Sequence, residues 1–320
     1  DPLLATVCGK LDPLGQNRKQ ARDRGKALAG KSTLNRLETY GAGSLENQGY
    51  KKIYYSEQAI DAFFVEAFLD SYRKPPREIT LDVDASDDPL HGHQQGRFFH
   101  GYYDCYCYLP LYIFCGDQLL CAKLKTANRD PGNEALPDVK RVVEQIRRRW
   151  PKVRITLRAD SGFCREELMS WSELNNVFYL FGLARNTRLL KRITKEMKKA
   201  RKRYAQTYEA QRIYKDFTYR TLTSWSRSRR VIGKAEYLAK GENPRFVVSN
   251  LPRELIAAAE LYETHFCARG DTENRIKEQQ LYLFADRTSS STLRANQLRL
   301  YFSSLAYVLL SELRRRVLPG

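Results

Sequence analysis

The sequence contains no uninterrupted apolar stretch of about 18 residues, the minimum for a helix that spans a membrane. It also shows no signal peptide at its start, no internal repeat and no low-complexity linker. None of its seven cysteines belongs to a Cys-x-x-Cys pair, the spacing typical of structural zinc sites and thiol redox motifs. We therefore expect a protein of the reduced cytoplasmic compartment with no membrane partner.

Acidic residues are scarce relative to basic ones. The 37 Asp and Glu residues face 55 Lys and Arg residues, which gives a formal net charge of +18. Such an excess concentrates polyanions around a protein, so DNA or RNA is the partner that the composition favours. A basic protein that binds no nucleic acid has the same composition, and the charge alone does not separate the two.

The order of the elements predicted up to residue 184 indicates an α/β fold. An amphipathic helix at 56–72, capped by Ser56, precedes a strand at 78–86 that alternates apolar and polar side chains. Three strands followed by alternating helices and strands predict a mixed sheet flanked by helices. The later segments are strands at 102–116 and 118–127 joined by a tight turn at Gly116-Asp117, a helix at 135–150, a strand at 153–160, a helix at 165–176 and a strand at 177–184.

The rest of the chain changes in character. Residues 188–203 carry nine Lys and Arg against one Glu. Short strands are expected within 212–250, and helices at about 254–280 and about 291–316. The last helix is apolar on most of its circumference, which favours a place in the core and leaves part of its surface for a dimer contact.

Two aspartates at strand ends are the most informative residues. Asp84 ends the strand at 78–86, and Asp160 ends the strand at 153–160. In a sheet of this order the first and fourth strands are neighbours, so we expect the two carboxylates side by side. Like charges at that distance repel unless a cation lies between them, which points to Mg²⁺ or Mn²⁺. Each Asp alone is also an ordinary turn former.

Three further residues bear on this pair. Asp82 shares a strand face with Asp84, either as a further ligand or as a hydrogen-bonded neighbour. Arg269 and Glu273 are spaced i, i+4 on one helix face, which suits a third carboxylate and a guanidinium that orients it or contacts a phosphate. An ordinary surface ion pair has the same spacing.

Together these segments resemble the DDE transposases of bacterial insertion sequences, in particular the branch numbered thirteen-eighty of the insertion-sequence-four-like group. The resemblance runs from about residue 78 to the C-terminus and rests on LDVDAS with Asp84, HG…GYYDCYCYLPLYIF, RADSGF with Asp160, and the helix with Glu273. The family's third-acid signature is Tyr, two residues, Arg, three residues, Glu, six residues, Lys. This chain has Phe266, Arg269, Glu273 and Gln280 at those positions.

The resemblance implies an RNase H-like catalytic core at 76–186 and 254–320, a basic helix with a β-rich insertion at 187–253, and a helical N-terminal region at 1–75. It further implies that Asp84, Asp160 and Glu273 hold Mg²⁺ or Mn²⁺, two ions in all. The reaction would be cleavage of double-stranded DNA at transposon ends and strand transfer to target DNA, without ATP. A homodimer would carry it out in the bacterial cytoplasm, in association with the nucleoid.

Two alternatives stay open at this point. One is a catalytically inactive, transposase-derived DNA-binding protein, for which the changes at Phe266 and Gln280 leave room. The other is a different RNase H-like nuclease, which the long insertion between Asp160 and Glu273 disfavours because such nucleases are compact.

The basic stretch at 188–203 is the best candidate for contact with the DNA backbone, because so many neighbouring cations repel one another unless a polyanion is present. Trp225 either stacks on an unpaired base or is buried in the core of the insertion. The residues expected to contact DNA are Arg269, Trp225, Lys191, Arg192, Lys195, Lys198, Lys199, Arg201, Lys202 and Arg203.

A P-loop pattern, Gly25-x₄-Gly30-Lys31-Ser32, is interpreted as accidental. A working P-loop follows a buried strand, whereas the preceding residues here are polar and basic. We expect instead a loop that ends in the Ser32-Thr33 cap of a short helix through Tyr40, with Lys26 and Lys31 available to DNA phosphates.

A zinc site at His91 and His93 with Cys105 and Cys107 is disfavoured. A Cys-x-Cys spacing within a strand directs both thiols to one face of an apolar sheet and departs from the usual ligand spacing of structural zinc.

Overall fold

The computed structural model describes Gln16, residues 20–25, Glu38 and residues 55–317. A short 3₁₀ turn, η1, spans Ala21–Asp23. The P-loop-like stretch after Gly25, with Lys26 and Lys31, and the helix expected to reach Tyr40 lie outside the described residues, Glu38 excepted. None of the helices described is long and apolar enough to cross a membrane.

One mixed sheet of nine strands organises the described chain. Its order is β11-β10-β12-β8-β7-β1-β5-β6, with β9 paired to β10. The pairs β1–β7 and β7–β8 are parallel, and the remaining pairs are antiparallel. The strands are β1 (Glu78–Ala85), β5 (Leu111–Cys115), β6 (Gln118–Lys123), β7 (Arg154–Ala159), β8 (Phe178–Leu183), β9 (Gln211–Tyr219), β10 (Arg229–Leu238), β11 (Gly241–Glu242) and β12 (Arg245–Ser249).

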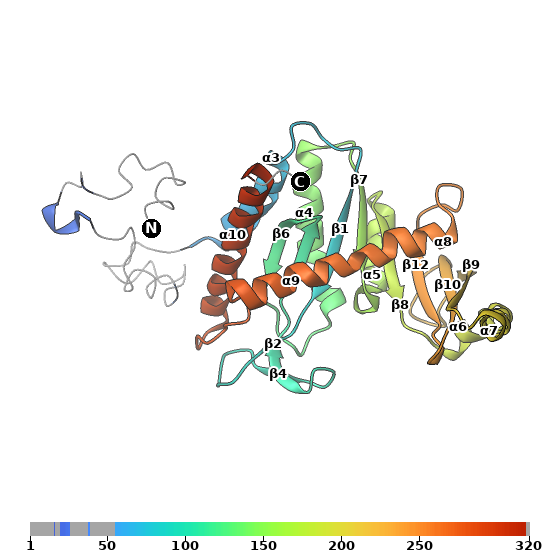
Figure 1. Ribbon diagram of the computed structural model, residues 1–320. Coiled ribbons are helices and arrows are strands. Elements are labelled where there is room, and N and C mark those ends of the chain that lie inside the picture. Colours follow the sequence, from blue (N-terminus) through green and yellow to red (C-terminus); the bar gives the residue numbers. More distant parts are fainter. Residues whose placement is uncertain (1–15, 17–19, 26–37, 39–54, 318–320) are drawn as a thin grey trace.

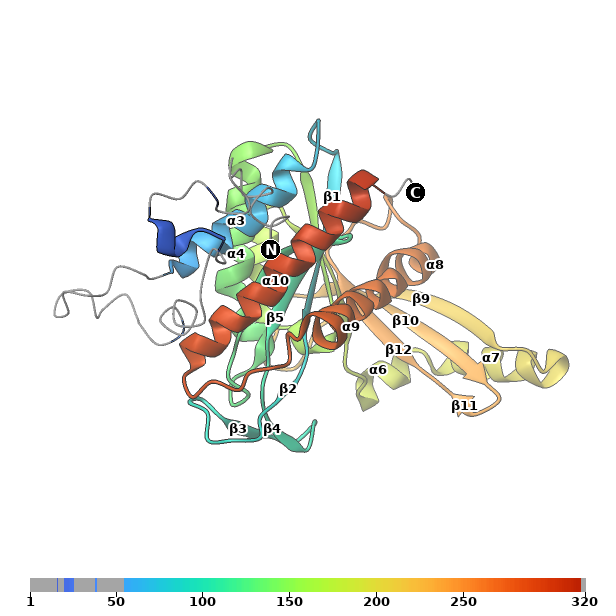
Figure 2. The ribbon, with the colours of Figure 1, turned by 60° about the vertical axis from the view of Figure 1, so that its left-hand side comes forward.

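A small second sheet lies beyond the carboxyl end of β1. It consists of β2 (Asp88–Pro89), β4 (Cys105–Tyr108) and β3 (Phe98–His100), in that order. Figures 1 and 2 both place it past the end of the large sheet at which β1 stops.

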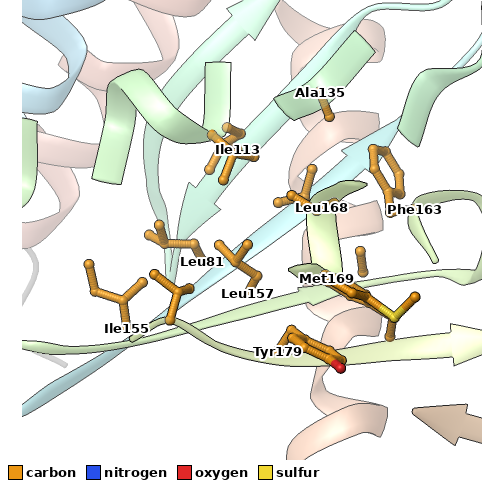
Figure 3. Packing of buried hydrophobic residues seen from close by; sticks show 14 of the residues in the cluster. Leu81, Ile113, Ala135, Ile155, Leu157, Phe163, Leu168, Met169 and Tyr179 are labelled. Atoms are coloured by element: carbon orange, nitrogen blue, oxygen red, sulfur yellow. The ribbon is translucent and has the colours of Figure 1, made fainter. Parts of the chain in front are cut away.

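Helices cover both faces of the large sheet. The alternation in β1 decides which side chains meet them: Leu81 and Val83 belong to the apolar cluster on the side of α4 and α5, together with Leu157 and Met169 (Figure 3). The opposite face packs against α9 and α10. The helices are α3 (Glu57–Asp70), α4 (Pro131–Arg149), α5 (Glu166–Leu174), α6 (Thr187–Arg192), α7 (Thr194–Thr207), α8 (Ala258–Glu260), α9 (Gly270–Leu283) and α10 (Leu293–Val317), with the 3₁₀ turns η3 (Ser161–Phe163) and η5 (Cys267–Arg269) and the π-helical turn η4 (Leu261–Phe266).

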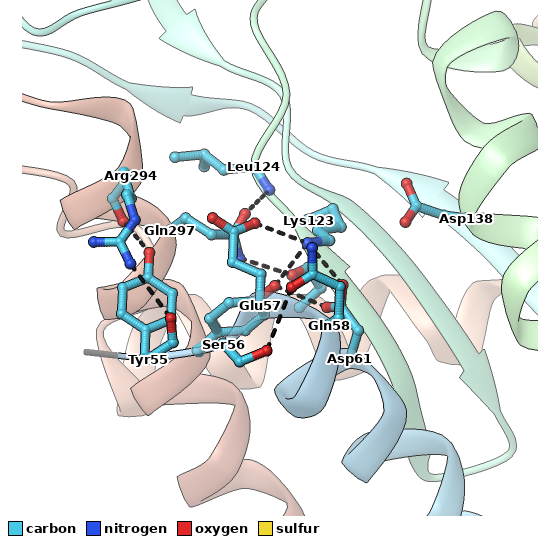
Figure 4. Close-up of polar contacts among 12 residues, drawn as sticks. Tyr55, Ser56, Glu57, Gln58, Asp61, Lys123, Leu124, Asp138, Arg294 and Gln297 are labelled. Carbon is cyan, nitrogen blue, oxygen red and sulfur yellow. Dashed lines mark hydrogen bonds and ion pairs between the residues drawn. The ribbon is translucent and has the colours of Figure 1, made fainter. Parts of the chain in front are cut away.

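A polar network joins α3, β6 and α10 (Figure 4). Lys123 Nζ lies 2.8 Å from Asp61 Oδ2 and 3.1 Å from Glu57 Oε2. The hydroxyl of Tyr301 donates to Asp61 Oδ1 at 2.8 Å, and Gln297 Oε1 accepts from the backbone of Leu124 at 2.7 Å. These contacts connect segments that are far apart in the sequence and give the buried carboxylate of Asp61 its partners.

Most of the predicted elements are confirmed. The helix predicted at 56–72 is α3, and Ser56 caps it by accepting from the backbone of Ala59. The first and fourth predicted strands, β1 and β7, are parallel neighbours. The helix predicted at 135–150 begins earlier, at Pro131, because Asp130 caps it and proline suits the first turn.

The single strand predicted at 102–116 is wrong. The chain forms β4 in the small sheet and β5 in the large one, with Leu109 and Pro110 between them. Pro110 has no backbone N–H to give to a ladder, so the strand ends there and the chain changes sheet. The apolar run continues across this point, which is why its periodicity did not reveal the break.

Two helical segments also differ from prediction. The basic stretch forms two helices, α6 and α7, that meet at Ile193. The helix expected from about 254 begins at Ala258 and passes through η4 and η5 before α9.

The strands between residues 211 and 249 extend the large sheet, since β12 pairs with β8.

Candidate active site

The side-by-side placement of Asp84 and Asp160 follows from strand register. Val83 of β1 pairs with Ala159 of β7, so Asp84 and Asp160 come next on parallel neighbours. Asp84 points away from the α4 side, and its Oδ1 accepts from the backbone N–H of Ala85 at 2.9 Å. The two carboxylates therefore meet at the carboxyl ends of the strands, where α/β sheets usually bind ligands.

Close backbone packing fixes the turn that carries Asp160. Its Oδ1 accepts from Gly162 N at 2.8 Å and so caps η3. A Cβ on Gly182 of β8 would lie 2.8 Å from Ser161 N, and one on Gly132 of α4 would lie 2.5 Å from Gly162 O. Only glycine allows the neighbouring elements to approach this closely, so both glycines hold the Asp160 turn in place.

The third acid comes from α9, which crosses the sheet in front of β1 (Figure 1). Arg269 and Glu273 lie on one face of the helical run, as their i, i+4 spacing predicted. The guanidinium of Arg269 bridges two acids: one nitrogen is 3.1 Å from Asp84 Oδ2 and the other 2.7 Å from Glu273 Oε1. The side chain of Glu273 remains 47% exposed.

Burial and neighbouring charges perturb Asp84. Burial raises the pKa of its carboxyl to about 7, the charge of Arg269 opposes the rise, and the carboxylates of Asp160 and Glu273 add to it. The ionised form of this carboxyl is therefore short of positive charge even with Arg269 in contact.

All three acids line one cleft of about 710 Å³. A second cavity, of about 750 Å³, lies between α3, α9 and α10 and contains none of them. The other side chains lining the acidic cleft include Ser86, Asp87, His100, Tyr102, Tyr103, Ser161, Phe163, Arg269, Lys277 and Gln280.

The donor set fits a hard divalent cation. Carboxylate oxygens are the preferred ligands of Mg²⁺ and Mn²⁺. Across the described residues, however, no three His, Cys, Asp or Glu side chains are grouped closely enough to hold a metal ion. The Arg269 guanidinium bonds to two of the three acids, so a metal that takes all three as ligands requires it to move.

A known protein family matches the whole chain. The family model described as "Transposase DDE domain group 1" covers residues 1–320. The chain belongs to this family. No curated protein matches the chain closely enough to count as a relative. Membership indicates a DNA transposase with DNA as its partner.

Asp82 of the transposase makes contacts suited to a supporting role. It lies directly opposite Arg158 in the β1–β7 ladder, is almost completely buried, and its Oδ2 accepts from the Arg158 guanidinium at 2.8 Å. A carboxylate held in this way has little capacity left for a metal ion, which favours the neighbour interpretation over the ligand one.

The basic residues of α6 and α7 that were predicted to contact DNA lie away from the cleft, whereas Arg269 lines it. In Figures 1 and 2, α7 stands at the edge of the molecule opposite α10. Within the described part of the chain, none of the eight Lys and Arg residues between positions 191 and 203 takes part in an ion pair. All are exposed: Lys191, Arg192, Lys195, Lys198, Lys199, Arg201, Lys202 and Arg203.

Trp225 is buried in this transposase. Only 4% of it is exposed, its ring packs edge-to-face on Tyr219 at 5.8 Å, and the Arg229 guanidinium lies 5.5 Å from its centroid. The fold therefore supports the burial alternative, and its ring is not accessible to a base in this conformation.

The departures from the family signature have structural explanations. Gln280 Nε2 donates to Ser86 Oγ at 3.2 Å and to the carbonyl of Asp87 at 3.1 Å, so it supports the loop after β1. Phe266 packs against Tyr262 with ring centroids 5.5 Å apart.

Two features of the cleft were missed at the level of sequence. Lys277 lies one helical turn beyond Glu273 and lines the cleft. Its i, i+4 spacing from Glu273 was a usable signal. Tyr102 and Tyr103 were assigned to a strand and not to a site, because nothing in their spacing shows that the small sheet borders the acids.

Proposed function

We propose that this protein is a metal-dependent DDE transposase of the thirteen-eighty branch, which cleaves DNA at transposon ends and joins the ends to target DNA. The observation that carries the proposal is the convergence of Asp84, Asp160 and Glu273 on one cleft in a chain of this family. In this proposal residues 76–186 and 254–320 form the RNase H-like core, residues 187–253 the insertion, and residues 1–75 a further DNA-contacting region.

Asp84, Asp160 and Glu273 would hold two Mg²⁺ or Mn²⁺ ions. When bound, such ions supply the activation of a water nucleophile and the stabilisation of a departing 3′-oxygen. Each of the three acids is held in a different way. Asp160 is fixed by its own turn, Asp84 by burial on β1, and Glu273 is the most exposed of the three.

Arg269 has a second role available when DNA enters the cleft. Its planar guanidinium suits a phosphate as well as a carboxylate. A backbone phosphate can draw it away from Asp84 and Glu273, which frees their oxygens at the moment the substrate arrives. Lys277, on the same helix face, adds a positive charge where Gln280 cannot.

DNA binding would extend beyond the cleft to the exposed basic face of α6 and α7. Unpaired cations on a solvated helix attract the phosphate backbone without reading sequence. The protein would act as a homodimer on two transposon ends, without ATP, in the bacterial cytoplasm next to the nucleoid.

A catalytically inactive DNA-binding protein is the second candidate. The Arg269 bridge favours it, because a guanidinium that stays between Asp84 and Glu273 blocks the oxygens that a metal needs. The two candidates differ in whether DNA displaces Arg269.

The test is incubation of the full chain with a labelled duplex that carries the inverted repeat flanking its gene, with and without Mg²⁺. We expect binding in both conditions and strand cleavage at the repeat boundary only with Mg²⁺. Specific binding without cleavage in Mg²⁺ or Mn²⁺ would establish the inactive alternative, and cleavage in the presence of a chelator would refute metal dependence.

A further inference from the structure

Large aromatic side chains gather on β3, on β4 and on the turn that joins them. We call residues 98–106 the aromatic hairpin. Tyr102 is 85% exposed, and Phe98, Phe99 and Tyr106 are also exposed. Single exposed rings are ordinary, but several on one short hairpin form an apolar surface that indicates a binding site.

The hairpin borders the acidic cleft. His100, Tyr102 and Tyr103 line the same cleft as Asp84 and Asp160. Figures 1 and 2 show the small sheet just beyond the end of β1 that carries Asp84. A polymer whose backbone lies over the acids is therefore within reach of the hairpin.

Neighbouring rings hold these side chains in place. Tyr102 packs edge-to-face on Tyr103 with centroids 5.0 Å apart, and Tyr103 packs on His100 at 5.0 Å. Elsewhere on the hairpin, Phe99 and Tyr106 pack with ring centroids 5.5 Å apart. The guanidinium of Arg97, the residue just before the hairpin, lies 3.8 Å from the Tyr106 centroid. Rings that already contact a neighbour lose less entropy on stacking than isolated exposed rings, and Arg97 adds a positive charge beside Tyr106.

We propose that the aromatic hairpin binds unpaired bases of a DNA strand that enters the cleft, with Tyr102 as the main stacking ring. Bases inside a duplex are stacked on both faces by their neighbours, so an unpaired base offers an aromatic side chain a free face that an interior paired base does not. Tyr102 contributes little to the core, which leaves its ring free for this contact. The inference rests on the proposed function, because it requires DNA in the cleft.

The same structure argues against the alternative location. The buried ring of Trp225 cannot accept a base without unpacking Tyr219 and Arg229. Trp225 therefore belongs to the core of the region that follows β8, whereas Tyr102 is exposed and lines the acidic cleft.

The experiment measures binding of the full chain to two labelled duplexes in a chelator, so that cleavage plays no part. One duplex is blunt, and the other has the same sequence with a short single-stranded overhang that contains 2-aminopurine. We expect wild type to prefer the overhang and to change its 2-aminopurine fluorescence. In Tyr102→Ala the ratio of overhang affinity to blunt-duplex affinity should fall by about fivefold or more, while binding to the blunt duplex is unchanged. Tyr102→Trp should keep the wild-type ratio. Tyr282→Ala is the matched control, because Tyr282 is 73% exposed on α9 and does not line the cleft.

The outcomes separate this inference from the function on which it rests. A wild-type chain that binds neither duplex contradicts the proposed function. A wild-type chain that binds both equally, or a Tyr102→Ala variant that keeps the preference, contradicts the hairpin inference alone. If Tyr102→Ala loses affinity for both duplexes equally, the hairpin contacts the duplex itself, and the stacking role is likewise overturned.

Discussion

At the scale of single residues, Arg269 supplies a positive charge to the acids of the cleft. It contacts Asp84 and Glu273 together, yet the pKa of Asp84 still stands at about 7. One guanidinium thus offsets only part of the repulsion and burial that three carboxylates create. The negative charge that remains is the reason to expect that the site attracts a metal ion.

Replacing Arg269 by alanine should strengthen metal binding to the DNA-free protein. The variant removes a positive charge that competes for the same oxygens, so the dissociation constant for Mn²⁺ should fall by about tenfold, the equivalent of one pKa unit. Titration followed by the paramagnetic resonance of free Mn²⁺ measures it. Arg275→Ala is the control, since Arg275 lies on the same helix but pairs with Asp117. Unchanged Mn²⁺ affinity in Arg269→Ala would show that the bridge does not compete with metal.

Asp88 is a second perturbed carboxyl, separate from the three acids. It is 1% exposed, and neither carboxyl oxygen has a hydrogen-bond partner within the described residues. Burial raises its pKa from 3.8 to about 7, the nearby Thr288 hydroxyl opposes the rise, and Asp286 and Asp87 add to it. Between about pH 4 and about pH 7, the folded protein therefore keeps a proton on Asp88 that the unfolded chain has released.

The contribution of Asp88 to stability should consequently fall as pH rises from about 4 to about 7, because in that window its carboxyl holds more protons in the folded state than in the unfolded state. Asp88→Asn removes this contribution. The free energy of unfolding of this variant relative to wild type should increase through the window and level off once the pH has passed the folded-state pKa of about 7. Urea denaturation across this pH range measures the difference. The exposed control Asp104→Asn should show no such trend, and a parallel pH profile for Asp88→Asn would contradict the assignment.

At the scale of elements, the position of α3 depends on a buried ion pair more than on surface ones. Lys123→Ala leaves Asp61 buried without its cation and should cost about 3–5 kcal/mol in the free energy of unfolding. Arg149→Ala removes an exposed pair with Asp70 and should cost less than about 1 kcal/mol. Chemical denaturation of both variants compares them, and equal costs would mean that the network of Figure 4 does not anchor α3.

The same scale shows what the sequence could and could not predict. Alternation in β1, the Ser56 cap and the i, i+4 spacing of Arg269 and Glu273 are local patterns, and the structure confirms each. The change of sheet at Pro110 was hidden because the apolar run on both sides reads as one strand. The Arg269 bridge to Asp84 depends on where α9 crosses β1, which no local pattern encodes.

At the scale of the whole molecule, positive charge and acidic chemistry are separated. The three acids meet at the strand ends, while the exposed basic face of α6 and α7 lies at the far edge of the extended sheet (Figure 2). DNA that contacts both must run along the molecule, which would give the protein a long backbone footprint in addition to a cutting site.

Neutralising the basic face should weaken DNA binding in a salt-dependent way. With Lys198, Lys199, Arg201 and Lys202 changed to glutamine, affinity should fall. The slope of log K against log salt should become shallower by about 0.9 for each phosphate that the variant no longer neutralises. Fluorescence anisotropy over a salt series measures both. The control is Lys152→Gln, which should leave the slope unaltered. Lys152 is exposed and precedes β7, at the end of that strand opposite Asp160. An unchanged slope in the quadruple variant would place the DNA elsewhere.

The central claim is that Asp84, Asp160 and Glu273 form one catalytic unit, and single-turnover cleavage of a labelled transposon end in Mg²⁺ tests it most directly. Asp84→Asn, Asp160→Asn and Glu273→Gln should each reduce the cleavage rate by about a hundredfold or more while binding persists. Asp271→Asn, an exposed acid on the same helix as Glu273 that lines a different cavity, should cleave at the wild-type rate. Wild-type cleavage by any of the three variants would contradict the account.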